Sequence, residues 1–238
     1  RRNNFLLSLA KTGDMLGVSW LDLSTGDFFL EEIGLKNKPE AVVVSSLLSR
    51  LSPVEILVSD RYLQSPKLFE VFNEYRKKLS VLPEARFNFE NARRNLLNLF
   101  KVETLDAYGS FSRAEITAAG VLMDYVETTQ KGQMPRVEKP VKIYERQVME
   151  IDGATRRSLE LLESSSGDRG NSLLSVLDRT VTGAGARMLA GRIASPLVDT
   201  KEIGERLNVV EFFLNEEFIR DDVRALLKAC PDIERAVS

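Results

Sequence analysis

The sequence predicts an α/β domain followed by an all-helical segment, and three observations support this prediction. The first third alternates apolar and polar residues between short turn sequences, which is typical of strands. Helical and strand-like stretches then alternate up to about residue 100. After Gly109 the apolar residues recur every three or four positions, which is the period of an α-helix.

The first domain reads as a three-stranded meander followed by alternating helices and strands. Strand-like runs cover residues 4–10, 16–23, 26–33, 53–60 and 85–89. Helical runs cover residues 39–51, 65–79 and 90–100. Pro39 fits the first turn of its helix, and Ser65 with Pro66 fits an N-cap followed by the first helical position. The resulting order, βββαβαβα, is that of the ribonuclease H-like fold.

The helical part begins with residues 113–131 and continues to the end of the chain. In that first helix one apolar stripe is formed by Ile116, Ala119, Met123 and Val126. Residues 132–140 contain two prolines and are the predicted linker, so we divide the chain into domains at residues 1–133 and 134–238. Helices are also expected over residues 152–164, 171–179, 199–214 and 215–229.

The helix expected from residue 199 has a clear beginning and a clear apolar face. Asp199 and Glu202 form an N-cap and N3 pair that is akin to a capping box. The apolar ladder that follows consists of Ile203, Leu207, Val210 and Leu214.

Composition excludes several classes of function. The chain has no histidine, so triads with a histidine base and histidine-ligated metals are excluded. Its one cysteine, Cys230, cannot form an internal disulfide or a cysteine-built zinc site, and it fits a reducing cytoplasm. No apolar run approaches the roughly 18 residues of a membrane span. The chain starts Arg-Arg-Asn-Asn with no initiator methionine, so we expect a piece of a longer protein.

The glycine-rich stretch from Val181 to Pro196 has two possible interpretations. A phosphate-binding loop needs glycines in a fixed pattern between a strand and a helix, and neither the pattern nor a preceding strand is found here. A helix capped by Thr182 and ended by Pro196 explains more. Gly185, Leu189 and Ile193 would share one face, so we expect a second helix to pack closely at Gly185.

Several motifs in order along the chain resemble the MutS mismatch-repair family. Residues 173–200, LLSVLDRTVTGAGARMLAGRIASPLVDT, resemble the signature of the core, or lever, domain of that family. IDGATRRSLEL at 151–161 is similar to the opening of the same domain, and PDIERAVS at 231–238 resembles a later helix of it, with Ile233 in place of leucine. GVSWLDLSTGDF at 17–28 is similar to the connector domain, which is ribonuclease H-like.

This resemblance implies a scaffold role and no chemistry within these residues. Proteins of the family recognise mispaired duplex DNA, form homodimers, exchange ADP for ATP with magnesium, and recruit MutL. The mismatch-inserting, clamp and ATPase domains have no counterpart in this sequence. We therefore expect no enzymatic activity and assign no catalytic, cofactor-binding or metal-binding residue. The connector would couple mismatch binding to the ATPase and to MutL, and the lever would carry the conformational change.

A second hypothesis is a magnesium-dependent nuclease built on the ribonuclease H-like order. Such nucleases hold two metal ions about 4 Å apart with several carboxylates. The first predicted strand carries none, and the candidates are Asp22 on the second strand and Asp60 after the fourth. The simpler interpretation is that Asp22 is a strand-end or turn residue and Asp60 a helix cap.

Other charged and aromatic residues favour structural roles. Four arginines could contact phosphate, but we expect ion pairs with neighbours such as Glu160 and Glu163 or solvated faces; the four are Arg156, Arg157, Arg187 and Arg192. Basic and acidic residues number 33 and 35, so no broad electrostatic footprint for nucleic acid is present. Trp20, Phe28 and Phe29 are expected in the sheet, and Cys230 is expected to be buried.

Overall fold

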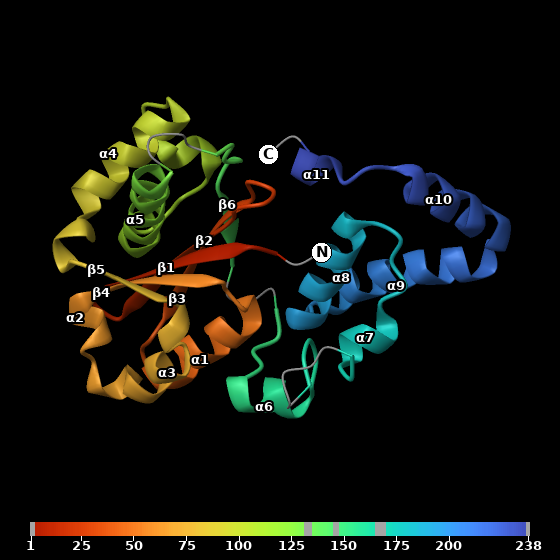
Figure 1. The fold of residues 1–238 in the computed structure, drawn as a ribbon, viewed down its shortest axis with the longest axis horizontal. Coiled ribbons are helices and arrows are strands. Elements are labelled where there is room, and N and C mark those ends of the chain that lie inside the picture. The colour runs from red at the N-terminus through yellow and green to blue at the C-terminus, as the bar shows by residue number, and fades with distance from the viewer. Residues whose placement is uncertain (1–2, 131–134, 145–147, 165–169, 237–238) are drawn as a thin grey trace. The chain divides into compact units, whose positions relative to one another are not determined.

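The computed structural model describes residues 3–130, 135–144, 148–164 and 170–236. Contacts divide the chain into two compact units, one running from residue 4 to 145 and the other from residue 146 to 237. The first unit contains a sheet covered by helices, and the second contains helices almost exclusively (Figure 1).

Six strands form one mixed sheet within the described part of the first unit, in the order β5-β4-β1-β2-β3-β6. Their bounds are β1 (Phe5–Thr12), β2 (Met15–Asp22), β3 (Phe28–Gly34), β4 (Glu55–Ser59), β5 (Leu79–Leu82) and β6 (Val141–Ile143). Strands β1, β2 and β3 pair antiparallel, as predicted for a meander. Strand β4 pairs in parallel with β1 and with β5, and β6 pairs in parallel with β3.

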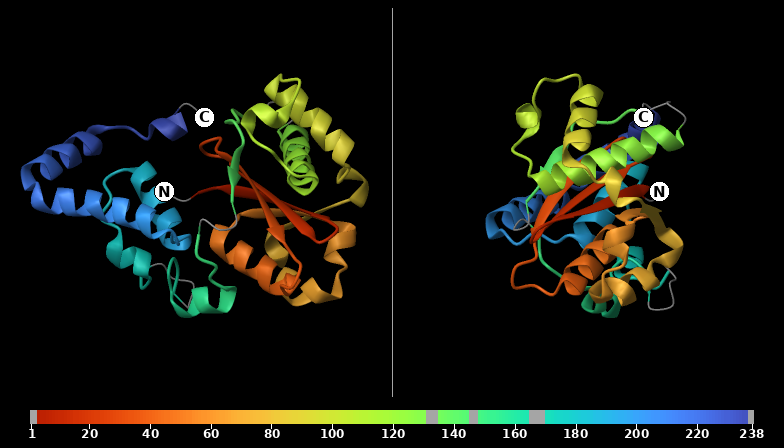
Figure 2. Two further views of the ribbon diagram at one scale, coloured as in Figure 1. Left: turned by 180° about the vertical axis from the view of Figure 1, so that it is seen from behind. Right: turned by 90° about the vertical axis from the view of Figure 1, so that its left-hand side faces the viewer.

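Helices cover both faces of this sheet, as Figures 1 and 2 show. One face is covered by α1 (Glu40–Leu51), α2 (Asp60–Leu63) and α3 (Phe69–Glu74), and the other by α4 (Phe89–Phe100) and α5 (Arg113–Thr129). Because successive strand side chains point to opposite faces, Leu7 and Leu9 join the first core while Leu6 joins the second. The predicted sheet residue Trp20 is buried and stacks on Phe29 at 5.4 Å between ring centroids.

Helix α5 is buried on nearly all sides along its first three turns. The predicted stripe of Ile116, Ala119, Met123 and Val126 is buried, and the intervening residues 117, 118, 120, 121 and 122 are buried too. The helix begins with a capping box: the Ser112 hydroxyl accepts from the Glu115 backbone, and the Glu115 carboxylate accepts from Ser112. Small residues allow this close burial, since a methyl group on Gly17 of β2 would lie 2.0 Å from the Ala114 carbonyl oxygen.

The order βββαβαβα is confirmed, but two predicted elements are displaced. The predicted strand at 85–89 is wrong: the strand is β5, which ends before Pro83, and Asn88 accepts from the Asn91 backbone to start α4. The predicted helix at 65–79 is broken into η1 (Pro66–Leu68), α3 and η2 (Arg76–Lys78). In each case a local apolar run fitted more than one element, and the tertiary packing selected among them.

The first unit extends beyond the predicted linker. Residue 133, where the sequence divides the chain, lies outside the described residues. After it the chain adds β6 to the sheet, and the Glu138 backbone donates to the Gly26 carbonyl at 2.9 Å. Gly26 has φ +82, and a methyl group there would lie 2.4 Å from the Arg136 carbonyl oxygen. Residues 135–144 are therefore part of the first unit.

The second unit consists of short helices followed by two longer ones. Its helices are α6 (Gly153–Ser158), α7 (Leu173–Leu177), α8 (Gly183–Ala194), α9 (Thr200–Asn215), α10 (Glu217–Ala229) and α11 (Ile233–Ala236). The helix expected over residues 152–164 ends at Ser158, shortly before Glu160 adopts a positive φ of 47. Asp199 caps α9 as predicted. None of the described helices is long and apolar enough to cross a membrane.

We predict that Gly17→Ala destabilises the first unit. The added methyl group meets backbone atoms of Ala114 and Glu115, which cannot rotate away, so α5 must move off the sheet. Overpacking of this kind costs typically 1–3 kcal/mol. Urea unfolding followed by the fluorescence of Trp20, the single tryptophan, measures the loss.

The matched control is Gly34→Ala, at the end of β3, where a methyl group meets nothing within 4 Å. It should leave the unfolding midpoint nearly unchanged. Equal stability of Gly17→Ala and the parent would show that α5 does not lie as close to β2 as described.

Candidate functional site

The glycine-rich stretch at 181–196 forms a helix. Helix α8 begins after Thr182, whose hydroxyl accepts from the Gly185 backbone at 3.0 Å, and it ends at Ala194, before Pro196. The preceding element, α7, is a helix. A phosphate-binding loop requires a strand at that place, so these residues do not fit a bound nucleotide.

The first turn of α8 already holds an anion, the carboxylate of Asp232. Both oxygens of Asp232 accept from the Arg187 guanidinium at 2.8 Å, which is a bidentate pair across 45 positions of sequence. A methyl group on Gly183 would lie 2.3 Å from one of these oxygens. The carboxylate thus occupies the positive end of the α8 dipole. We call the contact between Asp232, Arg187 and Gly183 the α8 clasp.

The charge of Arg187 sets the pKa of Asp232. Hydrogen bonds and Coulombic attraction from the guanidinium lower the pKa of this carboxyl to about 2. Arg187 is buried, which places its fixed positive charge where water screens it little. The clasp therefore keeps its charge over the whole physiological pH range.

The expectation of a close helix contact at Gly185 is wrong. A methyl group there would meet Thr182 and Thr180, which belong to the same local segment. The tight long-range contact lies two residues earlier, at Gly183. That contact is with the Asp232 carboxylate and not with a second helix, so the spacing of small residues in α8 did not predict it.

The remaining arginines also have structural surroundings. Arg156 is buried and donates to the Ala194 carbonyl at 2.5 Å, which ties α6 to the end of α8. Arg187 forms an ion pair with Asp232, 45 positions away, so an ion pair was the correct kind of contact. Arg157 and Arg192 are exposed. No group of buried or clustered arginines is left to face a phosphate in the described part of this unit.

The two carboxylates of the nuclease hypothesis lie near opposite ends of the strands. Asp22 pairs with Phe5 at the start of β1, whereas Asp60 follows β4, which runs parallel to β1 and ends near its far end. At about 3.3 Å per residue the separation is roughly 20 Å, far more than a shared pair of metal ions allows. No group of three or more acidic or cysteine side chains within the described residues could hold a metal.

Both carboxylates have structural hydrogen bonds. The Asp22 side chain is buried and accepts from the backbones of Asn4 and Ser24, at 3.2 and 2.9 Å. The Asp60 side chain accepts from the backbones of Arg61 and Glu84, at 2.8 and 3.0 Å. Asp22 is therefore a turn residue, as expected, while the N-cap of α2 is Ser59 and Asp60 joins the ends of β4 and β5.

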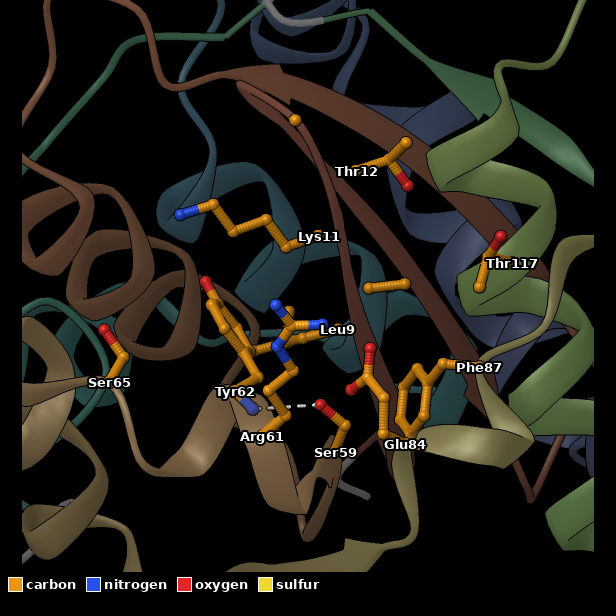
Figure 3. Close-up of a pocket in the computed structure, with 12 residues that line it drawn as sticks. Leu9, Lys11, Thr12, Ser59, Arg61, Tyr62, Ser65, Glu84, Phe87 and Thr117 are labelled. Atoms are coloured by element: carbon orange, nitrogen blue, oxygen red, sulfur yellow. Dashed lines mark hydrogen bonds between the residues drawn. The ribbon is translucent and has the colours of Figure 1, made fainter.

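A polar crevice of about 450 Å³ opens at the carboxyl ends of the parallel strands β1 and β4 (Figure 3). We call it the β1–β4 crevice. It is lined by Lys11 and Thr12 of β1, by Ser59 and Arg61 at the end of β4, and by Glu84 after β5. Sequence patterns did not predict this site, because its residues come from four separate segments, including Thr117 of α5, that only the fold brings together.

The long helices of the second unit present exposed apolar side chains. Neither α9 nor α10 contains a buried residue, and Leu207, Val210 and Leu214 of the predicted ladder are more than 60% exposed. Phe218 of α10 is 89% exposed. The expectation of a buried Cys230 is wrong, because this residue follows α10 and is exposed.

Comparisons with known proteins place this architecture. A family model described as MutS domain II matches residues 4–138, and one described as MutS domain III matches residues 154–238. The α/β unit followed by a helical unit thus matches two domains of one known family, and the chain belongs to the MutS family. Its two units correspond in order to MutS domains II and III.

Curated relatives agree with this assignment. The DNA mismatch repair protein MutS of Ruegeria pomeroyi is 42% identical over 238 residues, and that of Wolbachia pipientis wMel is 37% identical. Each match covers all of this chain but only 26% and 27% of the relative. The chain therefore spans about a quarter of the length of the curated relatives it matches.

We predict that Gly183→Ala destabilises the second unit, whereas Gly191→Ala does not. The first methyl group displaces the Asp232 carboxylate and breaks the α8 clasp; the second meets nothing within 4 Å and gains up to about 1 kcal/mol of helix propensity. A fluorophore on Cys230, the single cysteine, reports unfolding of this unit alone. A Gly183→Ala variant that melts at or above Gly191→Ala contradicts the clasp.

The clasp also makes the second unit sensitive to acid. The pKa of Asp232 is about 2 in the folded chain and about 3.9 in an unfolded chain, so its stabilisation is complete above pH 4 and is lost as pH falls toward 2. The melting temperature of the parent should exceed that of Asp232→Asn at pH 6, and the gap should narrow below pH 4. Asp222→Asn, on exposed α10, removes a carboxylate outside the clasp and is the matched control. A constant gap from pH 6 to pH 2 would overturn the assignment.

Proposed function

We propose that this chain forms the connector and the first part of the lever of a MutS mismatch-repair protein, and that it couples mismatch binding to ATP hydrolysis and to MutL recruitment. Two family models that match in order carry this proposal. The relatives that support it are named DNA mismatch repair proteins. We assign the first unit the ribonuclease H-like fold on the order of its elements and the role of connector. The protein would act in the cytoplasm as a homodimer.

The two units have the physical properties that a coupling element needs. Long-range communication requires rigid parts that have discrete arrangements. The first unit is rigid because helices cover both faces of its sheet and α5 is buried along most of its length. In the second unit, α9 and α10 extend for 16 and 13 residues, and their exposed apolar side chains are suited to contact with further protein.

Chemistry is proposed to take place outside these residues. ATP and magnesium would be held elsewhere in the parent protein, since α8 carries a carboxylate at its first turn and no described acidic cluster fits a metal. The nuclease hypothesis has no support, because Asp22 and Asp60 lie near opposite ends of the strands. Specific grip on mismatched DNA would likewise need parts beyond this chain, whose net charge is −2.

We predict that breaking the α8 clasp uncouples the complete protein without weakening its mismatch recognition. Asp232→Asn in full-length protein should bind a G·T duplex with unchanged affinity but lose most of the mismatch stimulation of ADP release. The matched control, Asp222→Asn, should behave as the parent. Fluorescence anisotropy measures DNA binding, and stopped-flow release of a labelled ADP measures coupling.

The 238-residue chain alone provides the complementary test. It should bind immobilised MutL saturably in surface plasmon resonance, hydrolyse no ATP, and bind G·T and matched duplexes equally, no tighter than the ~10⁻⁴ to 10⁻⁶ M of nonspecific contact. A preference for the G·T duplex, ATP turnover, or no MutL binding would each contradict the proposal.

A further inference from the structure

The β1–β4 crevice has the location and size of a small-molecule site. Ligands of open α/β sheets bind outside the carboxyl ends of parallel strands, and this crevice lies where β1 and β4 end, with Glu84 shortly after β5. Its volume of about 450 Å³ falls within the usual range of 300–1,000 Å³ for ligand pockets. Side chains from four segments, with Thr117 of α5 among them, lie around one opening in Figure 3.

Two cations line the crevice, and their surroundings differ. The Lys11 ammonium pairs with the Glu40 carboxylate at 2.9 Å, and that carboxylate also accepts from the Tyr62 hydroxyl at 3.0 Å. Burial, together with Glu40, raises the pKa of Tyr62, so its phenol keeps this proton. The charge of Lys11 is thus balanced within the chain.

The Arg61 guanidinium makes no hydrogen bond or ion pair within the described part of the chain, although its backbone is fixed. Its backbone N–H donates to Asp60 at 2.8 Å, and the preceding Ser59 caps the same short helix. The side chain of Arg61 is exposed at the rim of the polar crevice, where its unpaired guanidinium can donate hydrogen bonds to a compact oxyanion. Arg61 is therefore the group on which an anion would bind.

The other lining groups determine which oxyanion fits. The hydroxyls of Thr12, Ser59 and Ser65 can donate to further oxygens, and Leu9 and Phe87 provide an apolar part of the wall. The Glu84 carboxylate opposes a second negative charge but can accept a hydrogen bond. These features favour a ligand with two parts. One part is an oxyanion that accepts hydrogen bonds, and the other is a larger organic group with a hydroxyl that donates one.

We propose that the β1–β4 crevice binds phosphate as a monoester of a small polar molecule, with Arg61 as the principal anion-binding residue. Inorganic phosphate would occupy the same place more weakly, because it fills less of the crevice. The binding is independent of the mismatch-repair role and of the α8 clasp.

The experiment is an NMR titration of the ¹⁵N-labelled 238-residue chain with inorganic phosphate and, separately, with ribose 5-phosphate, at constant ionic strength. We expect saturable shifts of backbone amides at Thr12, Gly13 and Arg61, with ribose 5-phosphate binding at least threefold more tightly than phosphate. Saturation by inorganic phosphate with equal affinity would show that a free ion, and not a monoester, is the ligand, and would overturn the proposal.

Three variants test the assigned roles. Arg61→Gln should weaken ribose 5-phosphate binding at least tenfold, because a hydrogen bond to a charged group is lost. Glu84→Gln should strengthen binding about threefold, since a repulsive charge is removed. Lys67→Gln, a nearby exposed cation outside the crevice, should change nothing. Shifts that rise linearly without saturation, unchanged binding by Arg61→Gln, or an equal loss in Lys67→Gln would each refute the proposal.

Discussion

The close approach of α5 to β2 is the constraint on which the first unit depends. Gly17 leaves the space that the Ala114 and Glu115 backbone occupies, and Gly120 leaves the corresponding space for Ala92 of α4. Helix α5 can then be buried between the sheet and α4, which places both helices on one face. Two hydroxyls, those of Ser8 and Ser19, are buried without a partner in the described structure, and each such group costs about 1–3 kcal/mol. Close packing over small residues offsets that cost.

The second unit is held together by a different kind of interaction. Its longer helices, α9 and α10, bury no residue, so an apolar core does not fix where the chain returns after α10. The α8 clasp does, because a bidentate pair constrains both the distance and the orientation of Arg187 and Asp232. The Arg224 guanidinium of α10 adds a second polar contact, because it donates to the Arg179 carbonyl at 3.1 Å. These contacts fix the end of the α9–α10 pair to α8, while the apolar side chains of both helices stay exposed.

The contrast between the units fits the proposed coupling role. A unit with two apolar cores resists deformation, and a helical arm held by polar contacts can change its orientation at a small cost in buried surface. Coupling in the MutS protein would then depend on how firmly α8 and Asp232 stay joined. The β1–β4 crevice lies in the first unit, where the Asp60 carboxylate joins two of its lining segments by accepting from the backbones of Arg61 and Glu84.

Sequence alone determined the features that depend on neighbours within a few positions. The meander, the buried stripe of α5, and the caps at Thr182 and Asp199 follow from periodicity and from side chains that reach their own backbone. Sequence alone failed where one local pattern fitted two outcomes. A further strand was expected at 85–89, but the strand is the apolar run at 79–82, which pairs with β4.

Only the tertiary structure decided which residues meet across long distances in sequence. It paired Arg187 with Asp232 across 45 positions, placed the Asp232 carboxylate against Gly183, and separated Asp22 from Asp60. It also left Cys230 exposed and assembled the crevice around Arg61. The physical reason is that these contacts depend on the direction of each strand, the rotation of each helix about its axis, and the path of the chain back to α8 after α10. None of the three is encoded in the spacing of the residues concerned.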